Sequence, residues 1–193
     1  MLERLVPSPR KLLQRWRMRT YREKYDISDD IEFVNVGTLL SGDGTIEIGA
    51  GSYVSNDTKI HAHERCSVVI GENTAIGDQV RIYTRNKIAE QDMSTQSVAA
   101  LDEDSFRYGD VIIGDNCWIG ARVSVIEDTE IGKNTTVGTH SVVTRDIPPH
   151  CVAAGNPARV VKFKPYLSES EVARLSAEYP KVTKSVAAAS TTE

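Results

Sequence analysis

Aliphatic residues recur at every sixth position through the second half of the chain. These positions hold, in order, Ile113, Ile119, Val125, Ile131, Val137 and Val143. The residue two places before each of them is small or β-branched: Val111, Cys117, Val123, Thr129, Thr135 and Ser141. Positions six apart lie on different sides of an α-helix, so a helix cannot gather these residues on one face. The period therefore indicates a repeating β-structure.

A three-sided β-solenoid explains this period, because each group of six residues then forms one flat side and one corner. The aliphatic residue points inward and stacks on its equivalents in neighbouring coils, while a glycine or small residue permits the tight corner. Successive coils pair as parallel strands at a spacing of roughly 4.8 Å. The same period is found earlier in the chain, in Ile48, Val54 and Ile60 and again in Ile70, Ile76 and Ile82, with an irregular corner in between. An Ile/Val-rich sandwich with chance spacing is the alternative, and six consecutive matches argue against it.

Four segments follow from the pattern. Residues 31–163 form the solenoid, and residues 1–30 precede it as a basic helical segment. Residues 164–181 are predicted to hold a helix, because Ser168 and Glu171 form a capping-box pattern. Residues 182–193, which are rich in Ala, Ser and Thr, are expected to be disordered. Helices at both ends would cap the outermost coils, as solenoids require.

The basic segment allows two interpretations. Within residues 8–24, Leu12, Leu13 and Trp16 can share one helical face among lysines and arginines. Such a helix can pack on the first coil and cover its edge from pairing with other chains. A basic amphipathic helix can also make weak peripheral contact with an anionic membrane. We favour the first interpretation on the sequence alone.

The six-residue repeat stops between Ile82 and Val111. Residues 89–109 lack the period and are acidic and polar. A long loop inside a compact solenoid is usually functional, although a tolerated insertion would look the same. We expect this segment to protrude from the solenoid.

Composition excludes several classes of protein. The 193-residue chain has a net charge of −4, which gives no reason to expect a nucleic acid partner. No stretch is apolar enough to span a bilayer, and basic residues interrupt any signal-peptide core near the N-terminus. Cys66, Cys117 and Cys151 lie far apart and form neither a metal-ligand cluster nor an even disulfide set. These features predict a cytoplasmic protein.

Two segments of the chain closely resemble one family. They are Ile113-Gly-Asp-Asn-Cys-Trp-Ile-Gly-Ala121 and Gly138-Thr-His-Ser-Val-Val-Thr-Arg-Asp-Ile-Pro-Pro149, the latter continued by Ala154-Gly-Asn-Pro-Ala-Arg-Val-Val-Lys162. They are similar to the hexapeptide-repeat acyltransferases, which include maltose, galactoside and capsular-sugar O-acetyltransferases. The resemblance covers roughly residues 31–163. It implies a left-handed parallel β-helix that works as a homotrimer, with acetyl-CoA in the groove between two subunits and the loop of residues 89–109 covering the active site.

The resemblance also assigns cofactor contacts. The groove would be lined by Trp118, Gly120, Ala121, Gly138 and Thr139. Near the adenine and the phosphates it implies Pro157, Arg159, Arg145 and Lys162. Guanidinium and ammonium groups suit phosphates, although a solvated basic surface is the alternative for the three basic residues. No metal is expected, because the chain lacks the histidine pair, separated by four residues, that zinc-binding relatives use.

The reaction implied by the resemblance needs a general base. In relatives a histidine takes the proton from the acceptor hydroxyl as this attacks the thioester carbonyl. At that place this chain reads Tyr83-Thr-Arg-Asn-Lys87, so Arg85 or Lys87 occupies the expected position, and arginine cannot act as a base near pH 7. His61 and His63, about one coil earlier and on the same side of a strand, are the substitute candidates. Two surface histidines at an irregular corner are the alternative.

Other polar residues are candidates for binding the acceptor or for structural roles. Asn56 and Asp57 fall where relatives place a polar residue that contacts the acceptor, although Asn-Asp is also a good turn dipeptide. Tyr83 is a further candidate for acceptor binding. His140 is interpreted as a cofactor-side or structural residue, and His150 as a structural one.

We therefore expect an acetyl-CoA-dependent O-acetyltransferase acting on a saccharide or a similar small hydroxyl acceptor. Two alternatives stay open. One is a trimeric protein that binds CoA or sugar without efficient catalysis. The other is an N-acetyltransferase whose acceptor, an amino sugar, reacts with little help from a base.

Overall fold

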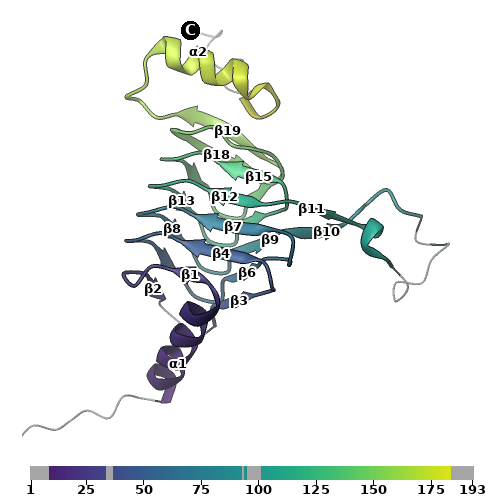
Figure 1. The fold of residues 1–193 in the computed structure, drawn as a ribbon. Helices are drawn as coiled ribbons and strands as arrows, with labels where there is room; N and C mark the ends of the chain where they lie inside the picture. The colour runs from purple at the N-terminus through teal and green to yellow at the C-terminus, as the bar shows by residue number, and fades with distance from the viewer. Residues whose placement is uncertain (1–8, 34–36, 93, 95–100, 184–193) are drawn as a thin grey trace, which may run out of the picture.

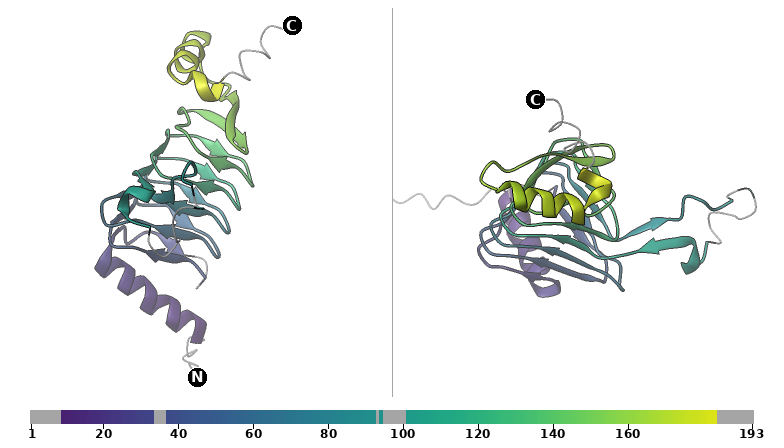
Figure 2. Two further views of the ribbon diagram at one scale, coloured as in Figure 1. Left: turned by 90° about the vertical axis from the view of Figure 1, so that its right-hand side faces the viewer. Right: turned by 90° about the horizontal axis from the view of Figure 1, so that it is seen from above.

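The computed structural model describes residues 9–33, 37–92, 94 and 101–183. In this part of the chain the backbone winds into a three-sided column of mostly parallel strands, with a helix at each end (Figure 1). Figure 2 shows the column from its side and its end, with a single arm projecting from it. The predicted β-solenoid with helical caps is confirmed, whereas its left-handed winding stays a prediction from the resemblance.

Each side of the column is one sheet, to which successive coils add a strand. The first face contains β1 (Asp26–Ile27), β4 (Thr45–Ile48), β7 (Ser67–Ile70), β12 (Val111–Ile113) and β15 (Thr129–Ile131). The second face contains β2 (Glu32–Phe33), β5 (Tyr53–Val54), β8 (Ala75–Ile76), β13 (Trp118–Ile119), β16 (Thr136–Val137), β18 (Cys151–Gly155) and β19 (Ala158–Phe163). The third face contains β3 (Leu39–Ser41), β6 (Lys59–His61), β9 (Arg81–Tyr83), β14 (Ser124–Val125) and β17 (Val142–Val143). Within these faces the paired strands are parallel, except that β18 and β19 form an antiparallel pair.

The aliphatic residues at the sixth positions form the core of the column. Ile70, Ile113 and Ile131 lie in register on the first face, and each is at most 1% exposed. A fully buried side chain of this size stabilises a fold by about 1.5–3 kcal/mol relative to an exposed one. The coils are therefore held together by the stacked side chains that the sequence pattern predicted.

The small residues two places earlier are also buried, and several carry a hydroxyl that links one coil to the next. Thr74 Oγ1 donates to the carbonyl oxygen of Gly114 at 2.9 Å. Thr58 Oγ1 donates in the same way to the carbonyl oxygen of Gly77 at 2.8 Å. Buried polar groups require such partners. Because each bond joins the residue just before a strand to a corner of the adjacent coil, these hydroxyls fix the stacking of the corners.

Two edges of the column have regular corners. At the edge between the first and second faces, Asn73, Asn116 and Asn134 have φ values of 51°, 57° and 57°. Asparagine is one of the few residues other than glycine that adopt this left-handed conformation readily. We call this edge the asparagine edge. The edge between the second and third faces, which carries Gly120 and Gly138, is called the Gly120 edge.

The third edge, where the third face leads back to the first, is irregular, and we call it the hairpin edge. From Leu40 onward the inward aliphatic residues are six positions apart across the other two edges. Across the hairpin edge four steps depart from six, with eight, ten, 31 and four positions: Leu40 to Ile48, Ile60 to Ile70, Ile82 to Ile113 and Val143 to Ile147. All the length variation in the described coils beyond Leu40 is therefore concentrated along one edge.

The longest of these steps contains the arm that projects from the column in Figure 1. Its base is a hairpin in which β10 (Arg85–Lys87) pairs antiparallel with β11 (Phe106–Tyr108). A short 3-10 turn, η2 (Glu103–Ser105), precedes β11. Asn86 donates a hydrogen bond to the buried carboxylate of Glu127 in the following coil, which anchors the hairpin to the column. The protrusion expected for residues 89–109 thus starts earlier, at β10, and residues 93 and 95–100 lie outside the described part.

The C-terminal helix α2 (Glu169–Glu178) begins with the predicted capping box, in which Ser168 and Glu171 bond each other's backbone N–H groups. Leu175 is buried beneath it. The expectation of disorder from residue 182 is wrong at its start: Val182 and Thr183 are each 2% exposed, and Thr183 Oγ1 donates to the carbonyl oxygen of Tyr179. Burial of these two side chains under the helix orders the chain to residue 183, and residues 184–193 lie outside the described part.

The N-terminal helix α1 (Pro9–Lys24) reaches the first coils through its C-terminal end. Tyr21 Oη accepts a hydrogen bond from the backbone N–H of Leu40 at 3.3 Å, and Tyr25 Oη, just beyond the helix, donates to the carbonyl oxygen of Gly42 at 2.8 Å. This half of the segment packs on the column in the way that a capping helix should. None of the helices in the described residues is long and apolar enough to cross a bilayer.

Candidate active site

The hairpin edge brings several candidate residues together. β6 ends at His61, and the longer corner that follows carries His63. In the next coil Tyr83, at the end of β9, lies in register with His61. The chain then enters the hairpin at Arg85. Four side chains that sequence reasoning connected with catalysis or acceptor binding therefore lie along one edge, within two adjacent coils.

His61 has the features of a general base. Ser41 Oγ lies 3.1 Å from His61 Nδ1, which orients the ring and leaves Nε2 for another partner. Burial lowers the pKa of His61, and the nearby charges of His63 and Arg85 lower it further. The imidazole is therefore neutral near pH 7, and neutral imidazole is the form that accepts a proton.

His63 packs against the hairpin instead. Its ring lies 4.7 Å from the ring of Tyr108, measured between centroids, and its backbone N–H donates to Thr84 Oγ1 at 2.8 Å. Its Nδ1 is buried and has no hydrogen-bond partner within the described residues. A buried nitrogen without a partner costs free energy, so this atom marks a place where a ligand or a neighbouring subunit would be stabilising.

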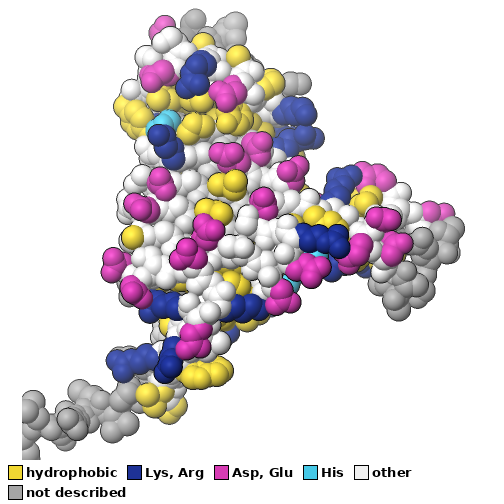
Figure 3. All heavy atoms as spheres, in the orientation of Figure 1, with side chains coloured by type: hydrophobic (Ala, Val, Ile, Leu, Met, Phe, Trp, Pro, Cys, Tyr) yellow, Lys and Arg dark blue, Asp and Glu magenta, His cyan; other side chains and the backbone are white. Residues whose placement is uncertain are grey.

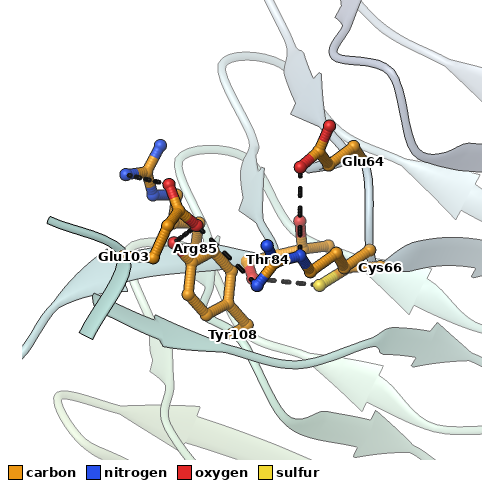
Figure 4. A network of polar contacts seen from close by, with 7 residues as sticks. Glu64, Cys66, Thr84, Arg85, Glu103 and Tyr108 are labelled. Carbon is orange, nitrogen blue, oxygen red and sulfur yellow. Dashed lines mark hydrogen bonds and ion pairs between the residues drawn. The ribbon is translucent and has the colours of Figure 1, made fainter. Parts of the chain in front are cut away.

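Arg85, at the position expected for the base, is packed into the foot of the hairpin (Figure 4). Its guanidinium carbon lies 3.6 Å from the centroid of the Phe106 ring, and a terminal nitrogen lies 3.9 Å from a carboxylate oxygen of Glu103. Glu103 also accepts a hydrogen bond from the hydroxyl of Tyr108. A guanidinium held by cation–π and ionic contacts stabilises the hairpin, and it supplies a positive charge beside the histidines rather than a base.

Lys87 follows on β10 and is exposed. It lies opposite Phe106 in the antiparallel register of the hairpin. Lys87 lines neither of the two hollows described below.

Two hollows lie along the hairpin edge beyond the histidines. The smaller, of about 360 Å³, lies beside the foot of the hairpin and is lined by Arg107, Tyr108, Ile126, Glu127, Asp128 and Thr144. The larger, of about 490 Å³, extends toward α2 and is lined by Asp128, Thr144, Arg145, Asp146, Glu178, Tyr179, Pro180, Lys181 and Val182. Because both hollows include Asp128 and Thr144, they form neighbouring parts of one depression. Arg145 is the only expected cofactor residue that lines it.

The other expected groove residues lie elsewhere. Trp118 is on the second face and is 59% exposed. Gly120 and Ala121 follow it at the Gly120 edge, and Gly138 and Thr139 occupy the same edge one coil later. A Cβ on Gly120 would lie 2.8 Å from the backbone nitrogen of Thr139, so close stacking of the coils itself demands glycine there. The structure therefore gathers these five residues at one edge and separates them from Arg145.

Pro157, Arg159 and Lys162 lie on the β18–β19 unit at the end of the second face. Arg159 is half-buried and donates to the carbonyl oxygen of the adjacent Ala158 at 2.7 Å. Lys162 is exposed. Gly138 follows β16, and β16 pairs with β18 on the second face. These three residues therefore lie further along that face than Gly138, toward the C-terminal end of the column.

Asn56 and Asp57 lie at the Gly120 edge, at the opposite end of β6 from His61. Asp57 has a φ of 53°, and the backbone N–H of Asn56 donates to Asp78 Oδ1 at 3.0 Å. Both residues thus build a corner, and within one subunit they do not meet His61 or Tyr83. His140 and His150 are also corner residues, with φ values of 61° and 60°.

Sequence reasoning missed Thr84, Glu103 and Tyr108, which lie close to Arg85 (Figure 4). Thr84 and Tyr108 also contact His63. Thr84 is fully buried, and its hydroxyl holds the corner that carries His63. Glu103 and Tyr108 belong to the arm, where the six-residue period is absent and cannot predict the direction in which a side chain points. An aromatic pair shortly before the repeat resumes, Phe106 and Tyr108, was the available signal for a second hairpin strand.

The described residues contain no cluster of three or more His, Cys, Asp or Glu that could hold a metal ion. All three cysteines are buried and free. Burial raises the pKa of the Cys117 thiol and raises that of Cys151 to about 12. These thiols are therefore core side chains and not nucleophiles.

The chain matches a known family model, described as bacterial transferase hexapeptide (six repeats), over residues 110–145. A putative acetyltransferase of Saccharomyces cerevisiae, YJL218W, is 39% identical over 117 residues, which are 61% of this chain and 55% of that protein. The chain thus spans about half the length of the yeast relative. The galactoside O-acetyltransferase of Escherichia coli is 29% identical over 150 residues, 72% of this chain and 73% of that one.

Solved structures show the same architecture. A maltose O-acetyltransferase from Clostridium difficile has a TM-score of 0.61 and 29% identity, covering 85% of this chain and 79% of that one. A hexapeptide-repeat acetyltransferase from Vibrio cholerae, solved with acetyl-CoA, has a TM-score of 0.64 at 22% identity, covering 78% of this chain and 77% of that one. At 22% identity, the similarity to the Vibrio cholerae protein shows a shared fold and no more.

Proposed function

We propose that this chain transfers an acetyl group from acetyl-CoA to a hydroxyl of a saccharide-like acceptor. The ground is that it belongs to the hexapeptide-repeat acetyltransferase family and is related to the galactoside and maltose O-acetyltransferases. The observation that carries the proposal is His61, a neutral, oriented imidazole on the edge where the hairpin leaves the column. His61 Nε2 takes the proton of the acceptor hydroxyl. The oxygen attacks the thioester carbonyl, the carbon–sulfur bond breaks, and CoA leaves as the thiol or thiolate.

Three neighbours support His61 in this role. Ser41 fixes its ring, in the way that a third group orients the base in other acyl transferases. Arg85 and His63 keep it neutral, since a second positive charge close by disfavours protonation. Tyr83 lies beside it in register and is the nearest candidate for contact with the acceptor. The positive charge of Arg85, in the place where relatives carry the base, thus takes on a positioning role.

The arrangement of the expected cofactor residues supports a homotrimer. Trp118 and Gly120 lie toward one edge of the column, and Arg145 lies in the depression along another. A single extended cofactor that contacts both groups would lie between the hairpin edge of one subunit and the Gly120 edge of the next. Closed cyclic assemblies create such paired contacts at every interface. We expect a trimer by light scattering at assay concentration, and a monomer would contradict this proposal.

The decisive assay is release of thiol from acetyl-CoA in the presence of a panel of sugars and amino sugars, with the product identified by its mass. Acetylation of a neutral sugar is the expected result. Acetylation restricted to amino sugars would establish the N-acetyltransferase alternative. Binding of CoA by calorimetry without thiol release for any acceptor would establish a binding protein and refute the proposed reaction.

The free thiols support a proposal for the compartment. Three free cysteines without a disulfide fit a reducing environment. The cytoplasm is therefore the proposed location.

A further inference from the structure

Helix α1 carries apolar side chains on two opposite sides. Tyr21 and Met18 face the column and pack against its core. Leu12, Leu13 and Trp16 are 50%, 47% and 64% exposed. Leu12 precedes Tyr21 by nine positions, which is about two and a half helical turns, so the two side chains point in opposite directions. The column of this subunit therefore cannot cover Leu12 and Trp16.

The same helix concentrates positive charge. Its sixteen residues include seven Lys or Arg and one Glu, in a chain whose net charge is −4. Arg15 lies one position before Trp16 and is exposed, and the side chain of Arg19 is 82% exposed. Figure 3 shows hydrophobic and basic side chains gathered together at this end of the molecule.

The helix is also fastened to the column at its far end. Lys24 Nζ lies 2.9 Å from Asp43 Oδ1, and Arg22 Nε lies 3.4 Å from Asp29 Oδ1. These contacts, with those of Tyr21 and Tyr25, hold the C-terminal turn of α1 against the first coils. The N-terminal half of α1, which carries the exposed apolar residues, thus extends beyond the end of the column (Figures 1 and 2).

We propose that α1 is a docking surface for an anionic lipid membrane. Leu12, Leu13 and Trp16 would enter the boundary between headgroups and acyl chains, where tryptophan is favoured, while Arg15 and Arg19 would contact the anionic headgroups. The charge of the helix selects this occupant. A second copy of α1 would bring its own Arg15 and Arg19 close to those of the first helix, and such like-charge contact is unfavourable. An anionic membrane complements both the apolar and the basic side chains.

Vesicle flotation tests the proposal with the full-length chain. The protein is expected to float with vesicles of phosphatidylcholine and phosphatidylglycerol, to remain unbound with pure phosphatidylcholine, and to be released by high salt. Leu12→Ser combined with Trp16→Ser should weaken binding about tenfold or more, because the inserted apolar area is lost. Arg15→Glu combined with Arg19→Glu should weaken it to a similar extent.

Val161→Ser is the matched control, because Val161 is an apolar residue of similar exposure, 58%, on β19 near the other end of the column. It should bind like the unmodified chain.

In a Trp118→Phe background Trp16 is the single tryptophan, so its fluorescence should shift to shorter wavelength only when anionic vesicles are added. Absence of flotation, or equal flotation of the Leu12/Trp16 variant, would overturn the proposal. A change of subunit number in that variant, measured by light scattering without vesicles, would instead identify a second copy as the occupant and overturn it as well.

Discussion

Replacing His61 with alanine is expected to lower kcat for acetyl transfer by about two to four orders of magnitude, the usual contribution of a general base. The reason is that Ser41 and the burial of the ring prepare a neutral imidazole whose other nitrogen is available. The loss should fall mainly on kcat and leave the KM for acetyl-CoA close to its original value. Initial rates of thiol release, measured over a range of both substrates, separate these two effects.

The pH profile gives a sharper readout of the same site. The base works when deprotonated, so activity should fall as pH drops through the pKa of His61. Because that pKa is lowered, the acidic limb of kcat/KM should lie below the ordinary histidine value of about 6.5. His63→Gln removes one of the charges that lower the pKa, so the limb should move to higher pH while activity above it is largely retained.

His150→Asn is the matched control for these two variants, because His150 is a corner residue at the asparagine edge with a φ of 60°, which asparagine tolerates. Its rate and its pH profile should match those of the unmodified protein. Unchanged rates in both His61→Ala and His63→Ala would eliminate the substitute-base hypothesis.

Ile119→Ala is expected to lower the free energy of unfolding by about 2–5 kcal/mol. Ile119 is fully buried and lies between Ile76 and Val137 in the middle of the second face. The parallel ladder fixes the distance between coils, so neighbouring side chains cannot collapse into the space that the missing atoms leave. Urea unfolding, followed by circular dichroism at one protein concentration, measures the change.

Ile112→Ala provides the comparison for this stability measurement. Ile112 lies in the same coil but is 40% exposed on the outside of the first face. Its truncation should cost no more than about 1 kcal/mol. Equal losses in the two variants would contradict the assignment of inward and outward positions along the repeat.

The core was predictable because its signal is periodic. Ile113, Ile119 and Val125 differ by six positions, and the structure places them on three successive faces of one coil. The corners were predictable in part. Three groups of six make one coil, so Gly120 and Gly138, which are eighteen positions apart, had to share an edge. By the same counting, Arg145 follows Gly138 by about one group of six and therefore had to lie at the next edge. The family resemblance assigned both residues to one cofactor and did not reveal that they lie at different edges.

The surroundings of the histidines could not be obtained in this way. The stacking of Arg85 on Phe106 joins residues that are 21 positions apart through a hairpin without a period. Ser41 and His61 are register partners on β3 and β6, but they are 20 positions apart because the corner after β3 is longer than the repeat, so counting in sixes does not pair them. Where chain length varies, position in the sequence no longer fixes position on the column, so contacts there depend on the three-dimensional packing.

The confinement of irregular steps to the hairpin edge has a consequence for how this architecture can acquire new specificity. Segments of different length can be exchanged along that seam while the ladders of the three faces, and the aliphatic stacks behind them, stay in register. Transplanting the arm between members of such a family should therefore alter which acceptors are recognised without requiring a new interior. The same transplant at the asparagine edge would break the hydrogen bond by which the side chain of Asn73 reaches that of Asn116 in the adjacent coil.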